Sequence, residues 1–125
     1  MKATHSFVPT IKNCVSALHH LPLFKKIRIC NRIYFISHTV PQKAKMLDWV
    51  HCRIPDFTMG EPEYEKTYFD DKIMVTGHTP TELIDKNYTG RIWHRNNHIA
   101  MDCRAVFGNP LGCICLETGE KFYTE

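Results

Sequence analysis

The sequence predicts an α+β fold in a single domain, residues 1–125, with short N-terminal helices followed by a mainly antiparallel sheet. Two observations carry this prediction. The 125 residues are 43% hydrophobic, which suits one globular domain able to bury a core. A helical apolar period near the N-terminus gives way to short β-rich runs, separated by turn residues, in the C-terminal third.

Helices are expected in two early segments. Apolar residues recur at i, i+3, i+4 and i+7 from Ile11 to Leu18, which predicts an amphipathic helix over residues 10–20 that Pro22 ends. A second, short helix is expected over residues 41–50, because its opening proline suits a first helical turn. Residues 53–71 show no steady period and predict a long surface loop, a kind of segment that is often functional.

Strands are expected on both sides of that loop. Residues 24–30 and 33–38 predict a hairpin with Asn31-Arg32 as its connection. Residues 72–77 are apolar on consecutive positions, as in a strand covered on both faces. Asn96-Asn97 suits a tight turn, because asparagine tolerates positive φ. Further strands are expected over residues 91–95, 98–103, 111–117 and 121–125.

Composition and charge argue against several functional classes. The net charge is only +3, and the 16 basic residues are spread among 13 acidic ones, so the footprint of a nucleic-acid binder is weak. No segment approaches the roughly 20 apolar residues of a membrane span. We therefore expect a cytoplasmic protein that binds neither nucleic acid nor membrane, and whose six cysteines are free and mostly buried.

The eight histidines are the most unusual part of the composition. His38 and His78 each follow a strand of buried character, and strand ends that converge in a sheet can bring distant histidines together as ligands for Zn, Mn or Fe. The alternative is a pair of hydrogen-bonded structural side chains. Four other histidines are expected to do no chemistry: His19, His20, His94 and His98.

Two other pairs of residues are candidates for chemistry. Cys113 and Cys115 would share one face of a strand and permit a thiolate pair, so a small Cys/His zinc domain is a further hypothesis. Asp70-Asp71 resembles a paired carboxylate, but adjacent loop residues usually point apart and stay solvated.

Several segments in this order resemble a known family. They are "NRIYFISH", "LDW", "IMVTGHTPT", "RIWHRNNHIAMDC" and "LGCICLETGEKFYTE". Together they resemble the C-terminal half of the calcineurin-like metallophosphoesterases, specifically the bacterial serine/threonine protein phosphatases of the phosphoprotein phosphatase type. The resemblance covers nearly the whole chain, and its most specific parts are "GHTPT" and the C-terminal segment.

The resemblance implies a fold, a reaction and a set of site residues. It implies part of a calcineurin-like β-sandwich whose strand ends hold a divalent metal pair (Mn, Fe or Zn) that hydrolyses phosphate monoesters. His38 and His78 match metal-binding histidines of the family, and Arg53 is the candidate phosphate-binding residue. Gly77 would allow close approach to the metal centre. The implied substrate is a phosphorylated protein or a small phosphoester.

Departures from the family pattern are equally informative. Members tend to read Asp-Cys-Gly-Ala where this chain has Arg104 after Asp102-Cys103, and the glycine of Val-His-Ala-Gly is replaced by Val40. The N-terminal motifs Gly-Asp-x-His-Gly, Gly-Asp-x-x-Asp-Arg-Gly and Gly-Asn-His-Glu, which carry the bridging aspartate and the general-acid histidine, do not occur in the sequence. No catalytic residue is therefore assigned, and the chain alone is expected to be inactive.

Two hypotheses follow from this incompleteness. The chain is the C-terminal portion of a metallophosphoesterase domain, or it is a non-enzymatic interaction module or remnant of that fold. Strand faces built to pack on an absent half would be exposed, so we expect self-association or pairing with a separate N-terminal half.

Overall fold

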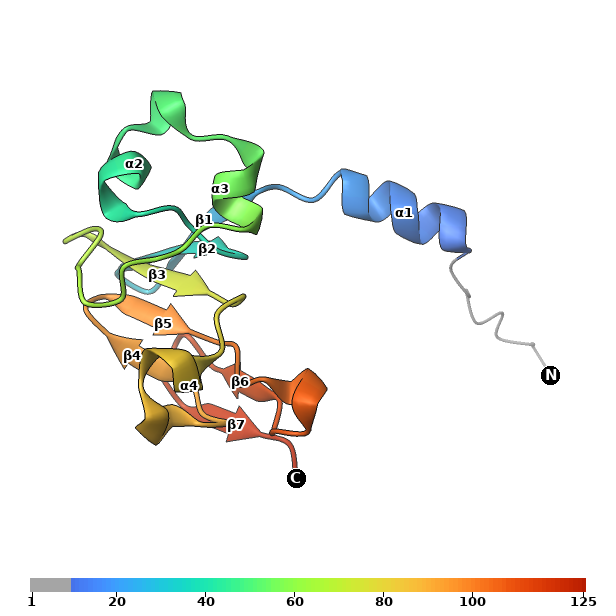
Figure 1. The fold of residues 1–125 in the computed structure, drawn as a ribbon, viewed down its shortest axis with the longest axis vertical. Coiled ribbons are helices and arrows are strands. Elements are labelled where there is room, and N and C mark those ends of the chain that lie inside the picture. The colour runs from blue at the N-terminus through green and yellow to red at the C-terminus, as the bar shows by residue number, and fades with distance from the viewer. Residues whose placement is uncertain (1–9) are drawn as a thin grey trace.

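A five-stranded mixed sheet forms the centre of the molecule in a computed structural model, which describes residues 10–125 (Figure 1). Its strands and the two strands of a smaller sheet are β1 (Phe24–Ile29), β2 (Arg32–Ser37), β3 (Lys72–Thr76), β4 (Trp93–Arg95), β5 (His98–Ala100), β6 (Gly112–Ile114) and β7 (Lys121–Tyr123). The helices are α1 (Ile11–His19), α2 (Lys43–Leu47), α3 (Ile54–Thr58) and α4 (Thr81–Ile84), with short 3-10 turns at Trp49–His51, Lys86–Tyr88 and Ala105–Phe107. The predicted α+β class is confirmed.

The strand order is β1-β2-β3-β5-β4, with a parallel centre between two antiparallel hairpins. β1 pairs with β2 and β4 pairs with β5 in antiparallel fashion, while β3 lies between β2 and β5 and is parallel to both. The expected antiparallel character therefore holds at the hairpins, and the expectation of a buried central strand holds for β3. The helices do not all precede the sheet, because α2 and α3 lie in the connection from β2 to β3.

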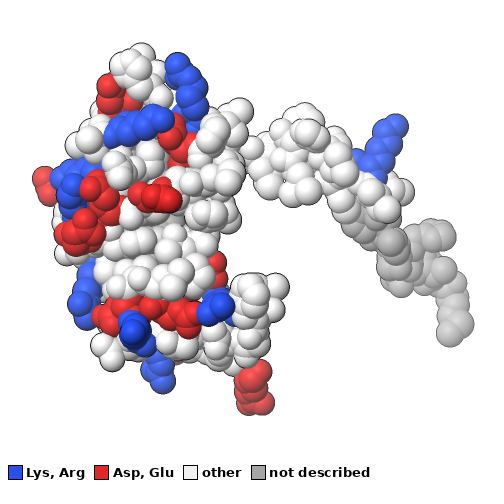
Figure 2. All heavy atoms as spheres, in the orientation of Figure 1, with Lys and Arg blue, Asp and Glu red and all other residues white. Residues whose placement is uncertain are grey.

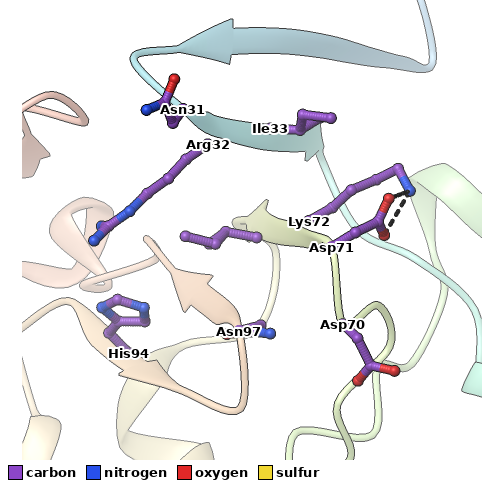
Figure 3. Close-up of a pocket in the computed structure, with 9 residues that line it drawn as sticks. Asn31, Arg32, Ile33, Asp70, Asp71, Lys72, His94 and Asn97 are labelled. Atoms are coloured by element: carbon purple, nitrogen blue, oxygen red, sulfur yellow. Dashed lines mark hydrogen bonds and ion pairs between the residues drawn. The ribbon is translucent and has the colours of Figure 1, made fainter.

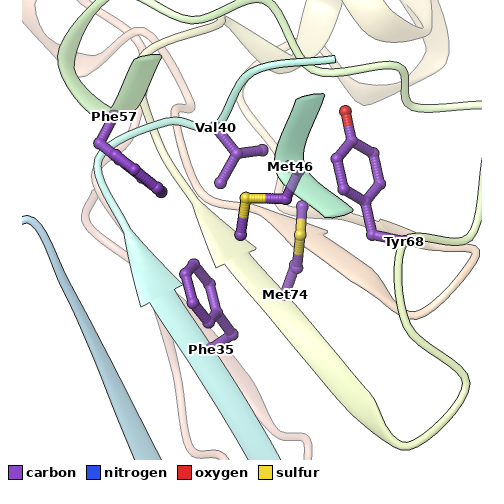
Figure 4. Packing of buried hydrophobic residues seen from close by; sticks show 6 residues of the cluster. All are labelled: Phe35, Val40, Met46, Phe57, Tyr68 and Met74. Carbon is purple, nitrogen blue, oxygen red and sulfur yellow. The ribbon is translucent and has the colours of Figure 1, made fainter. Parts of the chain in front are cut away.

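One face of the sheet carries a closed apolar core (Figure 4). Phe35 from β2 and Met74 from β3 point into it and meet Met46 of α2 and Phe57 of α3, all at most 3% exposed. Tyr68 completes the cluster, and its hydroxyl donates to the Pro41 carbonyl at 2.8 Å. Burial raises the pKa of Tyr68 to about 12, so this phenol stays neutral.

The opposite face of the sheet is covered less completely. Tyr34, Val75 and Ile99 are buried there, and the β6-β7 sheet covers them in part. The Tyr34 hydroxyl fixes that small sheet by donating to the Leu116 carbonyl at 3.0 Å. The side chains towards β1 on this face, which include Ile27, are only half-buried.

The predicted N-terminal helix forms, but its apolar side does not pack on the sheet. Thr10 caps α1, since its side chain accepts a hydrogen bond from the Asn13 backbone N–H at 3.3 Å. No residue of α1 is buried, and Ile11 is 85% and Leu18 66% exposed. Figure 1 shows α1 standing away from the body of the molecule.

The expectation of a wholly irregular surface loop over residues 53–71 is wrong in part. The segment contains α3, with Pro55 in its first turn, and it sends Phe57 and Tyr68 into the core. These two aromatic residues do not recur at a helical or strand period, so the sequence pattern does not predict their burial. The N-terminal hairpin is confirmed, but its connection is Cys30-Asn31, one residue earlier than expected, with Cys30 at φ 52°.

The six cysteines are free thiols, as expected, but most are not buried. Only Cys103 is buried, while Cys14, Cys30 and Cys113 are exposed. Burial raises the pKa of the Cys103 thiol. Within residues 10–125, no helix has the length and apolar composition needed to cross a membrane.

Candidate metal site

The three parallel strands bring polar residues to one edge of the sheet. Because β2, β3 and β5 run the same way, their carboxyl ends lie together, and Figure 1 shows all three arrowheads pointing towards the side where α1 lies. His38 follows β2, Gly77-His78 follow β3 and Asp102 lies shortly after β5. Residues from three separate segments of the chain therefore lie at the same edge of the sheet.

Backbone hydrogen bonds fix the segment Gly77–Thr81 on both sides. The Gly77 N–H donates to the His38 carbonyl at 2.9 Å, which continues the parallel pairing beyond the strands. The Thr81 N–H donates to the Asp102 carbonyl at 2.9 Å, and the Thr79 N–H closes a tight turn onto the Gly77 carbonyl at 2.7 Å. His78 is thus presented by a turn that is tied to both neighbouring strand ends.

His38 and His78 form the centre of the candidate site. His38 Nε2 lies 3.0 Å from His78 Nδ1, and the two ring centroids are 4.9 Å apart with an interplanar angle of 66°. Both side chains are exposed. One nitrogen donates a proton and the other accepts it, so the hydrogen bond fixes a complementary pair of tautomers.

The unusual backbone conformation of the turn lies at His78. Its φ is 66°, in the left-handed region that few non-glycine residues adopt. Gly77, by contrast, has no positive φ, and a Cβ added there would meet nothing nearer than the His38 carbonyl oxygen at 3.8 Å. No protein atom therefore crowds Gly77, and its role in close approach to a metal centre stays a prediction.

The end of β2 beside His38 is held by buried hydroxyl groups. Ser37 Oγ lies 2.7 Å from the Thr39 carbonyl oxygen, and Thr39 Oγ1 donates to the Gly60 carbonyl at 2.9 Å. Gly60 must be glycine, because a Cβ there would lie 2.2 Å from the Asp56 carbonyl oxygen and 2.5 Å from that of Val40. These contacts tie the segment after α3 to the strand end that carries His38.

The same segment forms one wall of a pocket that His78 lines. Gly60, Glu61 and Tyr64 face His78 and Thr79 across it. Burial raises the pKa of Tyr64, so its phenol stays protonated. Residues from the segment 53–71 thus line a pocket beside His78, and their functional role stays a prediction. Glu61 and Tyr64 carry no motif that would have identified them as lining residues.

Arg53 is placed by local contacts. Its Nη1 donates to the Val50 carbonyl and to the Cys52 carbonyl, both at 3.1 Å, and the residue is the N-cap of α3. The structure therefore brings His38 and His78 together and shows no hydrogen bond from Arg53 to either ring. The role of Arg53 as a phosphate contact stays a prediction.

The donor set suits part of a metal site. Two neighbouring neutral imidazoles can occupy two adjacent positions around Zn²⁺ or a similar divalent ion. Within residues 10–125, no group of three or more His, Cys, Asp or Glu side chains is close enough to hold a metal ion. The pair therefore fits two ligand positions of one metal but lacks the carboxylate bridge that a metal pair requires.

His98 on β5 is a structural histidine, in contrast to the pair. It is 1% exposed, and its Nε2 lies 2.7 Å from Thr76 Oγ1. The ring stacks on Tyr64 at 4.9 Å between centroids, with Trp93 at its edge. Desolvation by burial, and to a smaller degree the charge of His94, lowers the pKa of His98 to about 4, so the ring is neutral.

The aspartate pair lies at the other edge of the sheet, in a second pocket (Figure 3). Asp70 and Asp71 are exposed and point apart, and both carboxylate oxygens of Asp71 accept from Lys72 Nζ, at 2.7 and 2.8 Å. The Lys72 ammonium holds the pKa of Asp71 below its usual range. The expectation that the two carboxylates do not converge is confirmed.

The cysteine pair is not presented as a thiolate pair on one strand. β6 ends at Ile114, so Cys115 lies beyond it, and its thiol donates to a Glu117 carboxylate oxygen at 3.3 Å. The premise that Cys113 and Cys115 share one strand face is therefore wrong. The short β6 turns back at Cys115, whose N–H donates to the Glu120 carbonyl at 2.9 Å.

Comparison with known proteins adds no relative. No protein-family model matches the chain, and neither curated proteins nor solved structures give a significant match.

Proposed function

We propose that this chain is the C-terminal part of a metallophosphoesterase domain of the serine/threonine protein phosphatase type, which hydrolyses phosphate monoesters. His38 and His78 would hold two positions of its metal site, and Arg53 is the proposed phosphate contact. The observation that carries the proposal is the 3.0 Å approach of His38 Nε2 to His78 Nδ1 from the ends of adjacent parallel strands. When bound, a divalent metal supplies Lewis acidity and a hydroxide nucleophile to such a site.

The backbone at Arg104 supports the resemblance on which the proposal rests. Arg104 has φ 63°, in the left-handed region that glycine adopts without steric cost. This is the position at which the phosphatase pattern carries glycine. The Arg104 side chain forms an ion pair with Glu82, and its guanidinium stacks 4.7 Å above the Phe107 ring, so both contacts stabilise arginine at this position. The turn therefore has the shape that the family glycine would permit.

The chain's own residues place and orient the histidines but do not complete a catalyst. The Gly77 to His38 hydrogen bond and the Thr81 to Asp102 hydrogen bond set the position of the two rings. Among residues 10–125, no third His, Cys, Asp or Glu joins them in a group that could hold a metal ion. The proposal therefore includes inactivity of the 125-residue chain alone.

Calorimetric titration with Mn²⁺ and with Zn²⁺ tests the metal site. Wild type is expected to bind through the pair, whereas His38→Gln and His78→Asn should each weaken binding at least about tenfold, because one of two ligands is lost. Asparagine is chosen at position 78 because it tolerates the left-handed backbone. His94→Gln, on the exposed side of β4, is the matched control. Equal binding by all four proteins would refute the site.

Hydrolysis of p-nitrophenyl phosphate with excess Mn²⁺ tests the expected inactivity. The rate with wild type should equal the rate with His78→Asn. A metal-dependent rate that the substitution abolishes would show that the chain is a complete catalyst, and this part of the proposal would then be wrong.

The second candidate function is an interaction module without catalysis. Two observations favour it: the apolar side of α1 is exposed, and residues 10–125 offer the pair no third ligand. The coding DNA upstream of Met1 separates the two candidates. A Gly-Asp-x-His-Gly motif there, in frame or shifted, favours the phosphatase, and an unrelated upstream region favours the module.

A further inference from the structure

The histidine pair offers two ligands to a metal ion that requires more. Zn²⁺ in proteins is almost always four-coordinate when its role is structural, with tetrahedral nitrogen or sulfur ligands. His38 and His78 are exposed, and the described residues supply no third His, Cys, Asp or Glu ligand beside them. Within residues 10–125 the pair is therefore incomplete as a zinc site, and a partner molecule that brings two more ligands would complete it.

The separation of the two nitrogens suits a tetrahedral ion. With Zn–N bonds of about 2.0–2.1 Å, two ligand nitrogens lie roughly 3.3–3.4 Å apart. His38 Nε2 and His78 Nδ1 are 3.0 Å apart, so the pair must open slightly and both rings must turn until their lone pairs point at the ion. The ion takes the place of the proton between the rings. That proton moves to the outer nitrogen of its own ring, so both imidazoles stay neutral and no net proton is lost.

An apolar groove adjoins the pair. Leu21, Leu23, Phe24, Ile36 and Phe57 line it together with His38, and Leu21 is 64% exposed. Lys25 is the one charged side chain among the residues that line this groove, all of which the structure describes. Figure 2 shows few charged side chains on the part of the body that faces α1. Covering this groove therefore removes apolar surface from water at little cost in charge desolvation.

We infer that the partner that completes the site is a second copy of this chain, and that two histidine pairs hold one Zn²⁺ across a two-fold axis. This inference rests on the proposed role of His38 and His78 as metal ligands. A two-fold interface presents the same patch from both copies, so a patch with two ligands supplies four. The groove is continuous with the pair through His38, and the same axis places the two grooves against each other.

Sedimentation velocity during titration of the full chain with zinc chloride tests the inference. Wild type, kept reduced, is expected to convert from monomer to dimer and to saturate at one Zn²⁺ per two chains, and chelation should reverse the change. His38→Gln and His78→Asn should remain monomeric, while His94→Gln should behave as wild type. Leu21→Glu should weaken dimerisation at least tenfold, because it puts a charge into the groove.

Substitution of Co²⁺ for zinc identifies the ligands. Four imidazoles give the visible absorption of a tetrahedral site without a thiolate charge-transfer band, which would appear if exposed Cys14, Cys30 or Cys113 held the ion. A thiolate band would overturn the inference.

The other outcomes are equally decisive. One Zn²⁺ per chain without dimerisation overturns the inference and leaves the proposed metal site intact. Zinc binding that the histidine substitutions do not affect overturns both. A dimer that forms equally well without metal shows that zinc does not join the copies, and an unaffected Leu21→Glu dimer shows that the groove is not the interface.

Discussion

The sheet contains two histidine sites with the same side chain in opposite surroundings. His98 is 1% exposed, is bonded to Thr76 and lies against Tyr64, whereas His38 and His78 are exposed and bonded to each other. The buried ring has a structural role, because burial disfavours its charged form and Thr76 forms a hydrogen bond with its Nε2. The exposed pair can exchange its shared proton for another partner at little structural cost. Burial, and not residue type, separates a histidine that supports the core from a pair that is open to a ligand.

Truncation of the buried ring is expected to have the largest effect. His98→Ala should lower the free energy of unfolding by about 3–5 kcal/mol, as for a large core side chain, because it leaves a cavity among aromatic rings and removes the partner of Thr76. Urea denaturation measures this effect. A loss below about 1 kcal/mol would mean that His98 does not support the core and would remove the contrast between the two sites.

Acid should act on the buried ring next. The folded pKa of His98 is about 4 and lies below the ordinary value near 6.5, so the unfolded chain binds the proton first as the pH falls. Its contribution to the free energy of unfolding is fully present above pH 6.5 and falls by about 3 kcal/mol towards pH 4.

Urea denaturation from pH 7 to pH 4 checks the titration, with His98→Gln as the reference that lacks the titrating group. The stability difference between wild type and His98→Gln should shrink as the pH falls. Two curves that run parallel across this range would show that His98 is not held neutral by burial.

Backbone conformation at the edge of the sheet should have an intermediate effect. Arg104→Ala and Arg104→Gly both remove the Glu82 ion pair and the Phe107 stacking, but only glycine also accepts φ 63° without strain. The glycine variant should therefore be more stable than the alanine variant by about 1 kcal/mol in urea denaturation. Equal stabilities would indicate that the turn relaxes out of the left-handed conformation.

Loss of the exposed pair should have the smallest effect on stability. Without metal, His38→Gln and His78→Asn should each change the free energy of unfolding by no more than about 0.5 kcal/mol, because exposed polar contacts contribute little. The same denaturation assay measures it. A loss comparable to that of His98→Ala would place the pair among the structural residues.

Much of the fold could be predicted because local signals were strong. Apolar spacing predicts the helix after Thr10, and turn chemistry predicts the two hairpins. The second hairpin turns at Asn96-Asn97, whose φ angles are 53° and 55°. The parallel position of β3 between the hairpins could not be predicted, because an apolar run does not say which strands will flank it. Burial of Phe57 and Tyr68 also depends on this long-range arrangement.

For the candidate site, the proximity of the two histidines could be predicted, but the residues around them could not. His38 and His78 were identified because each follows a buried strand, and parallel pairing brings them together. The contribution of Glu61 and Tyr64 to the pocket depends on how Gly60 packs against the end of β2, a close backbone contact that no sequence pattern describes. His94 and His98 flank one turn, but His94 is exposed and His98 is buried. This difference depends on which side of β4 and β5 faces the core.

The parallel centre of the sheet also bears on the order of folding. Each hairpin joins neighbours in sequence, whereas pairing of β2 with β3 joins Ile33 to Lys72 and closes a long loop. Contacts of such long sequence separation form slowly, because loop-closure entropy is lost before they stabilise the chain. His38 and His78, 40 residues apart, meet only when that closure is complete. A probe that requires both rings would therefore follow the late step of folding, after the hairpins have formed.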